Sequence, residues 1–170
     1  MIGAKGITLI LLATVAMTSS AVAAPTRCSL WAHITDPDTQ GTNVRAAPTS
    51  KSRALVRLKK AGKRPPVVRV TGQRGAWFRI SKAEVAGRTA YKGAGWIHRS
   101  LLAVQLRGGA KMYAGPSRRT KQVSSTGDVE ADGKLLACRG GWAKIRHSES
   151  GKRGWLPASD HCPDMGTTCS

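Results

Sequence analysis

The sequence contains an internal repeat, and a repeat sets the number of folding units before any local signal is considered. Three blocks occur twice, in the same order and at similar spacing. In the first copy they are Asn-Val-Arg-Ala-Ala-Pro at 43–48, Gly-Ala-Trp-Phe-Arg-Ile at 75–80 and Gly-Trp-Ile at 95–97, and in the second copy they are Lys-Met-Tyr-Ala-Gly-Pro at 111–116, Gly-Gly-Trp-Ala-Lys-Ile at 140–145 and Gly-Trp-Leu at 154–156. The repeat predicts two small, related domains.

Both copies have the pattern of short β-strands. The segments 28–34, 54–58 and 67–71 alternate or are rich in β-branched residues, and Gly and Pro residues separate them. No segment has a sustained helical period. We therefore predict an all-β fold with a small barrel in each copy. The basic segment 59–66 and the polar segment 81–94 are expected to be loops.

Side-chain alternation predicts which residues face each core, because successive side chains of a strand point to opposite faces. Phe78, Ile80 and Ile97 are expected inside the first domain, so Trp77 and Trp96 face outward and oppose each other as a cross-strand pair. The second copy predicts the same arrangement, with Ala143, Ile145 and Leu156 inside and Trp142, Lys144 and Trp155 outside. Such a pair has two interpretations: it braces the sheet or the contact between the domains, or it forms an aromatic platform for a ligand.

The first 23 residues have the features of a cleaved signal peptide. Lys5 supplies the positive charge, residues 7–15 are almost wholly apolar, and Ala21 and Ala23 form a small-residue cleavage site. The alternative is a retained membrane anchor, but the apolar run is short for a membrane span. We expect an exported protein, located in the periplasm or outside the cell, with no transmembrane segment after cleavage.

Export favours disulfides for the four cysteines, because the compartments outside the cytosol are oxidising. Cys138 and Cys162 flank the last two blocks of the second copy, which suggests a Cys138–Cys162 disulfide within that domain. Cys28 and Cys169 then form a Cys28–Cys169 disulfide between the two ends of the chain. Three pairings are possible, so the connectivity stays open. The alternative is a zinc site of His161 with three cysteines, although the usual C-x-x-C spacing is missing.

The positive charge of the chain is concentrated in the first copy. The whole chain has 28 Lys and Arg against 9 Asp and Glu, and residues 24–107 alone hold 17 basic and 3 acidic side chains. Seven of the basic side chains lie close together in the sequence: Lys51, Arg53, Arg57, Lys59, Lys60, Lys63 and Arg64. Such a field attracts polyanions such as teichoic acid, lipopolysaccharide or nucleic acid, and it also serves simply as a solvated, soluble face.

The repeated blocks resemble those of bacterial SH3 domains from exported envelope proteins. The opening N-V-R-x-x-P, the later G-x-W and the closing G-W-[IVL] match well from 43 to 104, and more weakly from 111 to about 162. The resemblance implies two tandem SH3-like barrels, at 24–107 and 108–162, followed by a short tail at 163–170. It also implies binding to peptidoglycan or its peptide stems, often as an appendage to a cell-wall hydrolase.

The sequence shows no convincing catalytic set, so we expect no enzyme activity. His33, His98, His147 and His161 are scattered singly, and Cys138 has no nearby histidine. Only Glu84 is acidic between Asp38 and Asp128, which excludes a glycosidase carboxylate pair in the first domain. We also expect no cofactor and no metal ion.

These observations favour a binding protein whose site lies on the first domain. We expect Trp77, Tyr91 and Trp96 to supply apolar contact, Arg45 and Arg79 to hold acidic stems, and residues 81–94 to form one rim of the site. The alternatives are a less specific polyanion binder and an adaptor for a separate cell-wall enzyme. The oligomeric state and the actual ligand do not follow from the sequence.

Overall fold

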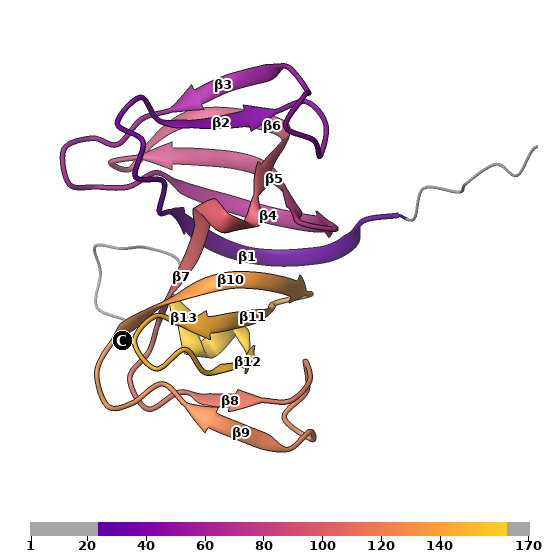
Figure 1. The fold of residues 1–170 in the computed structure, drawn as a ribbon, viewed down its shortest axis with the longest axis vertical. Helices are drawn as coiled ribbons and strands as arrows, with labels where there is room; N and C mark the ends of the chain where they lie inside the picture. Colours follow the sequence, from indigo (N-terminus) through magenta and orange to yellow (C-terminus); the bar gives the residue numbers. More distant parts are fainter. Residues whose placement is uncertain (1–23, 163–170) are drawn as a thin grey trace, which may run out of the picture.

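The computed structural model describes residues 24–162, which form one connected β-sheet of 13 strands with two short 3-10 helices (Figure 1). These residues contain no α-helix, so the all-β prediction is confirmed. The predicted signal peptide, residues 1–23, and the tail, residues 163–170, lie outside the described residues.

The repeat is visible in the order of the elements along the chain. The elements up to the middle of the sheet are β1 (Thr26–Ile34), β2 (Thr42–Arg45), β3 (Ala54–Leu58), β4 (Val67–Arg74), β5 (Trp77–Val85), β6 (Arg88–His98), the 3-10 helix η1 (Arg99–Leu101) and β7 (Leu102–Leu106). The remaining elements are β8 (Lys111–Tyr113), β9 (Gln122–Ser125), β10 (Ala131–Arg139), β11 (Trp142–His147), β12 (Arg153–Leu156), the 3-10 helix η2 (Ala158–Asp160) and β13 (His161–Cys162).

The strands follow the same spatial order in the two halves of the sheet. The first half, β1–β6, runs β3-β2-β6-β5-β4-β1, and the second runs β9-β8-β12-β11-β10-β7. Strand β7 pairs with β1, and β13 pairs with β7 in the same way, so β7 ends the first repeat and begins the second. The sheet is not closed, because β3 and β9 lie at its two ends. We refer below to β1–β6 as the first half and to β8–β13 as the second half (Figure 1).

The core has the residues that alternation predicts. Phe78, Ile80 and Ile97 are completely buried in the first half. Their counterparts Ala143, Ile145 and Leu156 are completely buried in the second half. These side chains belong to one hydrophobic cluster that extends through both halves.

The glycines of the repeated Gly-Trp blocks allow two strands to approach closely. A Cβ atom at Gly95 in β6 would overlap the side chain of Val44 in β2. A Cβ atom at Gly154 in β12 would overlap Met112 in β8 in the same way. The glycine therefore recurs because the second residue of the first block, Val44 or Met112, packs directly over it.

The segment 81–94 forms a hairpin, so the predicted loop there is wrong. Strands β5 and β6 continue as an antiparallel pair to Val85 and Arg88, and Ala86 and Gly87 form the turn. Both turn residues have positive φ, 50° and 77°, as a two-residue turn of type I′ requires. Many side chains of the segment are exposed or half-buried, which removes the alternation by which strands are recognised.

The disulfide of the described residues joins the two halves of the sheet. Cys28 in β1 is bonded to Cys138 in β10, with their Cα atoms 5.6 Å apart. The predicted Cys138–Cys162 and Cys28–Cys169 pairs are therefore wrong. Cys162 is also disulfide-bonded, and Cys169 lies outside the described residues. A zinc site of three cysteines is excluded, because Cys28, Cys138 and Cys162 are all in disulfides.

The correct pairing follows from the way in which β1 packs beside β10. The Ser29 N–H donates to the Gly140 carbonyl at 2.7 Å, and the Gly140 N–H donates to the Arg27 carbonyl at 2.9 Å. The Gln73 side chain adds to this contact, since its Oε1 accepts from the Cys138 N–H at 3.1 Å. The spacing of the cysteines along the chain carries no information on this contact between halves.

Candidate binding groove

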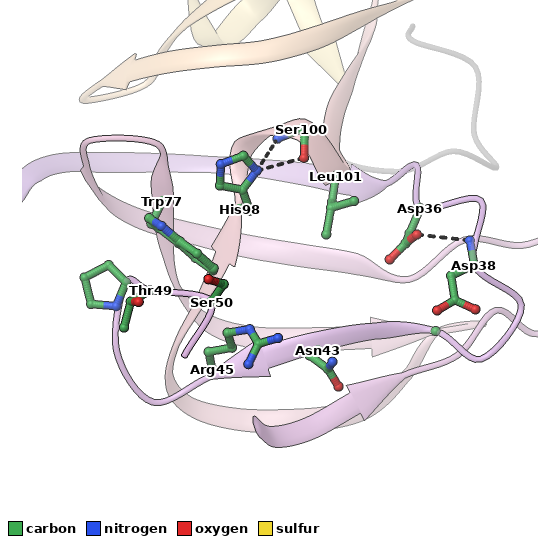
Figure 2. A pocket seen from close by; sticks show the side chains of 12 residues that line it. Asp36, Asp38, Asn43, Arg45, Thr49, Ser50, Trp77, His98, Ser100 and Leu101 are labelled. Atoms are coloured by element: carbon green, nitrogen blue, oxygen red, sulfur yellow. Dashed lines mark hydrogen bonds between the residues drawn. The ribbon is translucent and has the colours of Figure 1, made fainter. Parts of the chain in front are cut away.

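A groove of about 580 Å³ lies on the first half of the sheet (Figure 2). Its lining comes from the β1–β2 loop, from β2 and the loop that follows it, from the start of β5 and from the end of β6 with η1. The first repeated block, residues 43–48, therefore contributes directly to the groove.

Two residues of that block, Asn43 and Arg45, line the groove from β2. The Arg45 guanidinium donates from Nη1 to the Ser52 carbonyl at 2.7 Å, which holds the β2–β3 loop. Pro48, Thr49 and Ser50 in this loop form a second wall. The N-V-R-x-x-P block thus shapes the groove: its arginine holds the loop, and its proline belongs to the wall.

Trp77 and His98 form the aromatic end of the groove (Figure 2). They oppose each other across β5 and β6, and their rings are 5.2 Å apart in an edge-on arrangement with an interplanar angle of 73°. The Ser100 hydroxyl lies 2.8 Å from Nδ1 of His98, and the Ser100 N–H donates to the same nitrogen at 3.4 Å. The histidine therefore caps η1 and holds a fixed position beside the tryptophan.

Two carboxylates, Asp36 and Asp38, lie at the other end of the groove (Figure 2). Asp36 accepts from the Asp38 N–H at 3.0 Å and from the Thr42 hydroxyl at 2.7 Å. Asp38 accepts from the Gln40 N–H at 2.8 Å. The two bonds from backbone N–H groups, together with the Thr42 hydroxyl, order the β1–β2 loop, as is typical of Asp in turns.

The structure brings two of the five predicted binding residues into the groove. Arg45 and Trp77 line it, whereas Arg79, Tyr91 and Trp96 do not. Arg79 is exposed on β5 beside Trp96 on β6. Tyr91 lies on the β5–β6 hairpin, where its hydroxyl donates to the Ala94 carbonyl at 2.9 Å.

Trp96 is not the exposed tryptophan that alternation predicts. It lies outside the main hydrophobic cluster but is only 8% exposed. The Arg74 guanidinium lies 5.7 Å from the centre of its ring, a cation–π distance. A covered ring of this kind stabilises the sheet, which leaves Trp77 as the half-buried tryptophan of the groove.

The predicted pairs of facing tryptophans are also wrong. Trp77 opposes His98, and Trp96 opposes Arg79. In the second half Trp155 opposes Lys144, while Trp142 contacts Tyr113. The cause is the register, which places each pair of tryptophans two residues apart along the hairpin, and the repeat spacing does not reveal this offset.

The second half has a much smaller groove at the equivalent position. It measures about 250 Å³ and is lined by the β7–β8 loop, by Tyr113 and by Arg118 and Asp160. Tyr113 occupies the position of Arg45 in the repeat, is only 7% exposed and packs edge-on against Trp142, with ring centres 5.9 Å apart. The second half therefore fills with its own tyrosine the space beside the tryptophan that stays open in the first half.

Sequence reasoning missed most of the polar lining of the groove. No motif marks Asp36 or Asp38, and His98 is only one of four scattered histidines in the sequence. One signal does point to the aspartates: they are two of the three acidic side chains in residues 24–107, which hold 17 basic ones. Their position at the groove comes from the fold of the β1–β2 loop and has no sequence motif.

The basic side chains gather outside the groove, on β3 and the loops beside it. Strand β3 is at one end of the sheet. The seven basic residues of this region are exposed, and none is within ion-pair distance of a carboxylate among residues 24–162: Lys51, Arg53, Arg57, Lys59, Lys60, Lys63 and Arg64. The first half thus combines a cationic edge with a groove that contains two carboxylates.

Residues 24–162 include no group of three or more His, Cys, Asp and Glu side chains that could hold a metal ion. None of their helices has the length and the apolar character to cross a membrane.

Comparisons with known proteins return only distant structural likenesses. No family model matches the sequence, and no curated protein matches it. Among solved structures, the chain is similar to NlpC2 from Trichomonas vaginalis, with 16% identity and a TM-score of 0.36 over 79% of this chain and 48% of that one. It is similar to NlpC1 from the same organism, with 16% identity and a TM-score of 0.35 over 87% of this chain and 50% of that one.

The chain thus spans about half the length of the solved structures it matches. TM-scores at this level do not establish a shared fold. The proposals below therefore rest on the residues and the geometry of this chain.

Proposed function

We propose that this protein is an exported, non-catalytic binding protein that recognises peptidoglycan or its peptide stems through the groove of the first half. In this proposal the two halves are tandem SH3-like barrels, and the first one binds. The likeness of residues 43–104 to bacterial SH3 domains supports the assignment. One structural observation supports the choice of half: the groove is open beside Trp77 and filled by Tyr113 beside Trp142.

The composition of the groove suits a short peptide. It combines the flat ring of Trp77 with Arg45, two carboxylates and the hydroxyl groups of the β2–β3 loop. Small binding sites typically combine an apolar surface with a few fixed polar groups that orient the ligand. The hydrogen bonds of Arg45 and Asp36 hold these groups in place before a ligand arrives, which reduces the entropy lost on binding.

The serine–histidine pair at the groove does not argue for catalysis. Both the hydroxyl and the N–H of Ser100 lie against Nδ1 of His98, as in a helix cap. A nucleophile of the serine-hydrolase type needs a histidine oriented by a third group such as a carboxylate. Among the described residues, His98 has no carboxylate within ion-pair distance.

The test is retention on insoluble peptidoglycan at moderate salt. We expect the wild-type protein to be retained, and Trp77→Ala to weaken its binding by about tenfold, because a central aromatic contact contributes more than 1 kcal/mol to typical interfaces. Trp142→Ala is the matched control, since it removes the equivalent tryptophan from the half that is filled by Tyr113. No retention of the wild-type protein, or equal losses in both variants, would contradict the proposal.

A second candidate function is polyanion binding at the cationic edge. The seven exposed basic residues near β3 have no carboxylate partner among the described residues, so their field is not neutralised locally. Charged side chains on and beside an edge strand, here Arg57 on β3 and its basic neighbours in the adjoining loops, also discourage pairing between sheets, which is a competing explanation. Polyanion binding predicts affinity for heparin or lipopolysaccharide that falls steeply with salt and survives Trp77→Ala.

A further inference from the structure

We propose that the second half has a binding site of its own, which holds a phosphate group beside Lys134, Arg146 and His147. The site goes beyond the function proposed for the first half, because its ligand is chemically different and lies on the half whose aromatic groove is filled. The ligand is defined by its chemistry as a tetrahedral oxyanion: free phosphate, a phosphate monoester or a phosphodiester.

The site is a pocket of about 410 Å³ at the end of β10 and β11 that carries the turn after β11. Strand β10 contributes Lys134, β11 contributes Arg146 and His147, and the turn contributes residues 148–151. The backbone of His147 closes this turn, since its N–H donates to the Lys152 carbonyl at 2.9 Å and its carbonyl accepts from the Gly151 N–H at 3.0 Å. No residue of this pocket lines either of the two grooves described above.

His147 is the buried member of the lining and has an unpartnered ring nitrogen. Its side chain is 4% exposed, because it follows Ala143 and Ile145 on the inner face of β11. Its Nδ1 accepts from the Ser150 N–H at 3.2 Å, so the proton of the neutral ring is on Nε2. Nε2 has no hydrogen-bond partner among residues 24–162. A buried donor without an acceptor is costly, which points to an acceptor from outside the chain.

Three cations lie in a row across the outer face of the strands that carry the pocket. Lys134 on β10 is the register partner of Arg146 on β11, and Arg146 is the partner of Arg153 on β12. All three are exposed, and none forms an ion pair with a carboxylate among residues 24–162. Like charges directly opposite each other on neighbouring strands are destabilising. An anion bound beside Lys134 and Arg146 reduces this repulsion and also supplies the acceptor that His147 lacks.

The donors of the pocket suit a phosphate group. A lysine, an arginine and an imidazole N–H belong to one lining, and the Ser148 hydroxyl in the same lining forms no hydrogen bond with residues 24–162. A phosphate group offers more acceptor oxygens than a carboxylate, and both Arg and Lys are typical phosphate-binding residues. The lining has one carboxylate, that of Glu149, which lowers the net charge of the site and opposes the ligand.

Nε2 is covered by the protein, so a phosphate oxygen reaches it through a shift of the turn 148–151. All four residues of this turn are exposed. Its contact with the His147 ring is made by Ser150, whose N–H and hydroxyl lie 3.2 and 3.1 Å from Nδ1. Binding should therefore change the surroundings of the His147 ring and of the Ser150 N–H, and both can be followed separately.

Titration of the isotope-labelled protein with inorganic phosphate, followed by nuclear magnetic resonance, tests the proposal. Phosphate replaces chloride at constant ionic strength and pH, so that only the nature of the anion changes. We expect saturable shifts of the Ser150 amide and of the His147 ring, with a dissociation constant in the millimolar range. The absence of saturable shifts, or shifts confined to the basic residues 51–64, would overturn the proposal.

Four variants localise the site. Arg146→Gln removes an exposed cation of the pocket and should weaken phosphate binding by about tenfold. His147→Asn keeps a side-chain acceptor for the Ser150 N–H but removes the Nε2 donor, so it should weaken binding similarly; Arg146→Gln keeps the test valid if His147→Asn fails to fold. Arg139→Gln is the matched control, since it removes the same charge from an exposed position of β10 outside the pocket and should bind normally. Glu149→Gln removes an opposing charge and should strengthen binding by about twofold.

The variants also separate the site from simpler explanations. If Arg139→Gln weakens binding as strongly as Arg146→Gln, the general positive field of the protein is the cause and the proposal fails. If a folded His147→Asn variant binds phosphate as the wild-type protein does, a trapped water satisfies the Nε2 donor and the proposed site is wrong.

A parallel titration with dimethyl phosphate distinguishes the sources of the phosphate group. Binding of this diester indicates a phosphodiester polymer, whereas binding of inorganic phosphate alone indicates a terminal phosphate group. Retention on peptidoglycan tests the first half separately, and its failure would change none of these outcomes.

Discussion

The two halves of the sheet have one strand order but differ at matched positions inside and outside the core. Inside, Val44 and Phe78 of the first half correspond to Met112 and Ala143 of the second, and all four are completely buried. A larger residue at one position of the second half accompanies a smaller one at the other. The Val-to-Met exchange adds less volume than the Phe-to-Ala exchange removes, so one strand order is compatible with two differently packed cores.

The same comparison on the surface shows how a site is gained or lost. Arg45 holds a loop and leaves Trp77 accessible, whereas Tyr113 packs on Trp142 and reduces the groove to less than half the volume. The groove is open where the repeat has Arg45 and filled where it has Tyr113 at the matched position.

The largest expected effect is that of Phe78→Ala, which gives the first half the alanine that the second half has at the matched position, Ala143. Phe78 is completely buried, and the first half has Val44 where the second has the larger Met112. The cavity should lower the free energy of unfolding by about 3–5 kcal/mol, measured by urea denaturation. Phe78→Leu is the control and should cost less. A loss of unfolding free energy below about 1 kcal/mol would show that the first core accepts alanine at this position without a larger residue in place of Val44.

Removing the disulfide between the halves should have the next largest effect. The Cys28–Cys138 disulfide closes a loop with a sequence separation of 110 residues. The double variant Cys28→Ala/Cys138→Ala should therefore lose about 2–4 kcal/mol of unfolding free energy. Denaturation followed by tryptophan fluorescence shows whether the halves still unfold together. An unchanged midpoint would mean that the hydrogen bonds between β1 and β10 suffice to hold them.

The sequence predicts the features that depend on local pattern. The repeat predicted two equivalent sets of strands, and alternation predicted the buried faces of β5, β6, β11 and β12. The hairpin at 81–94 was missed because its exposed side chains leave no apolar alternation, and a positive φ at Ala86 has no sequence signal. Local patterns report burial, so an exposed strand reads as a loop.

The features that depend on contacts between distant segments could not be predicted. The Cys28–Cys138 disulfide and the Gln73 hydrogen bond to β10 require β1 and β4 to lie beside the second half. The acidic end of the groove needs the β1–β2 loop to lie opposite Trp77. Of the predicted binding residues, Arg45 and Trp77 lie at the groove because they belong to the repeated blocks that build it.

The groove itself is tested by Arg45→Tyr, which copies the second half into the first. A tyrosine at this position should pack on Trp77, as Tyr113 packs on Trp142, and should also free the β2–β3 loop from its hydrogen bond. Retention on peptidoglycan should fall by about tenfold, equivalent to about 1.4 kcal/mol of binding free energy. Arg79→Tyr makes the same change outside the groove and should bind normally. Equal losses would place the site on the exposed face of β5 instead.

The smallest expected effect concerns acid stability and a fourth matched position, where Leu102 at the start of β7 corresponds to His161 at the start of β13. Burial lowers the pKa of His161 below its ordinary value of 6.5, against the opposing effects of its hydrogen bond to the Gly141 carbonyl and of Asp160. The unfolded chain therefore binds a proton at a higher pH than the folded chain does. As the pH falls below 6.5, the unfolded state gains a proton that the folded state does not, so the stability falls until the folded pKa is passed.

His161→Leu should remove this part of the pH dependence, because it gives β13 the apolar residue that β7 has at the matched position. The measurement is the difference in unfolding free energy between about pH 7.5 and about pH 5, by urea denaturation of both proteins. The variant also loses the hydrogen bond at 3.0 Å from His161 Nε2 to the Gly141 carbonyl, which lowers its stability equally at both pH values. The slope with pH, not the absolute stability, is therefore the quantity that reports on the buried histidine. Identical slopes in the wild-type protein and the variant would show that His161 titrates alike in the folded and unfolded states.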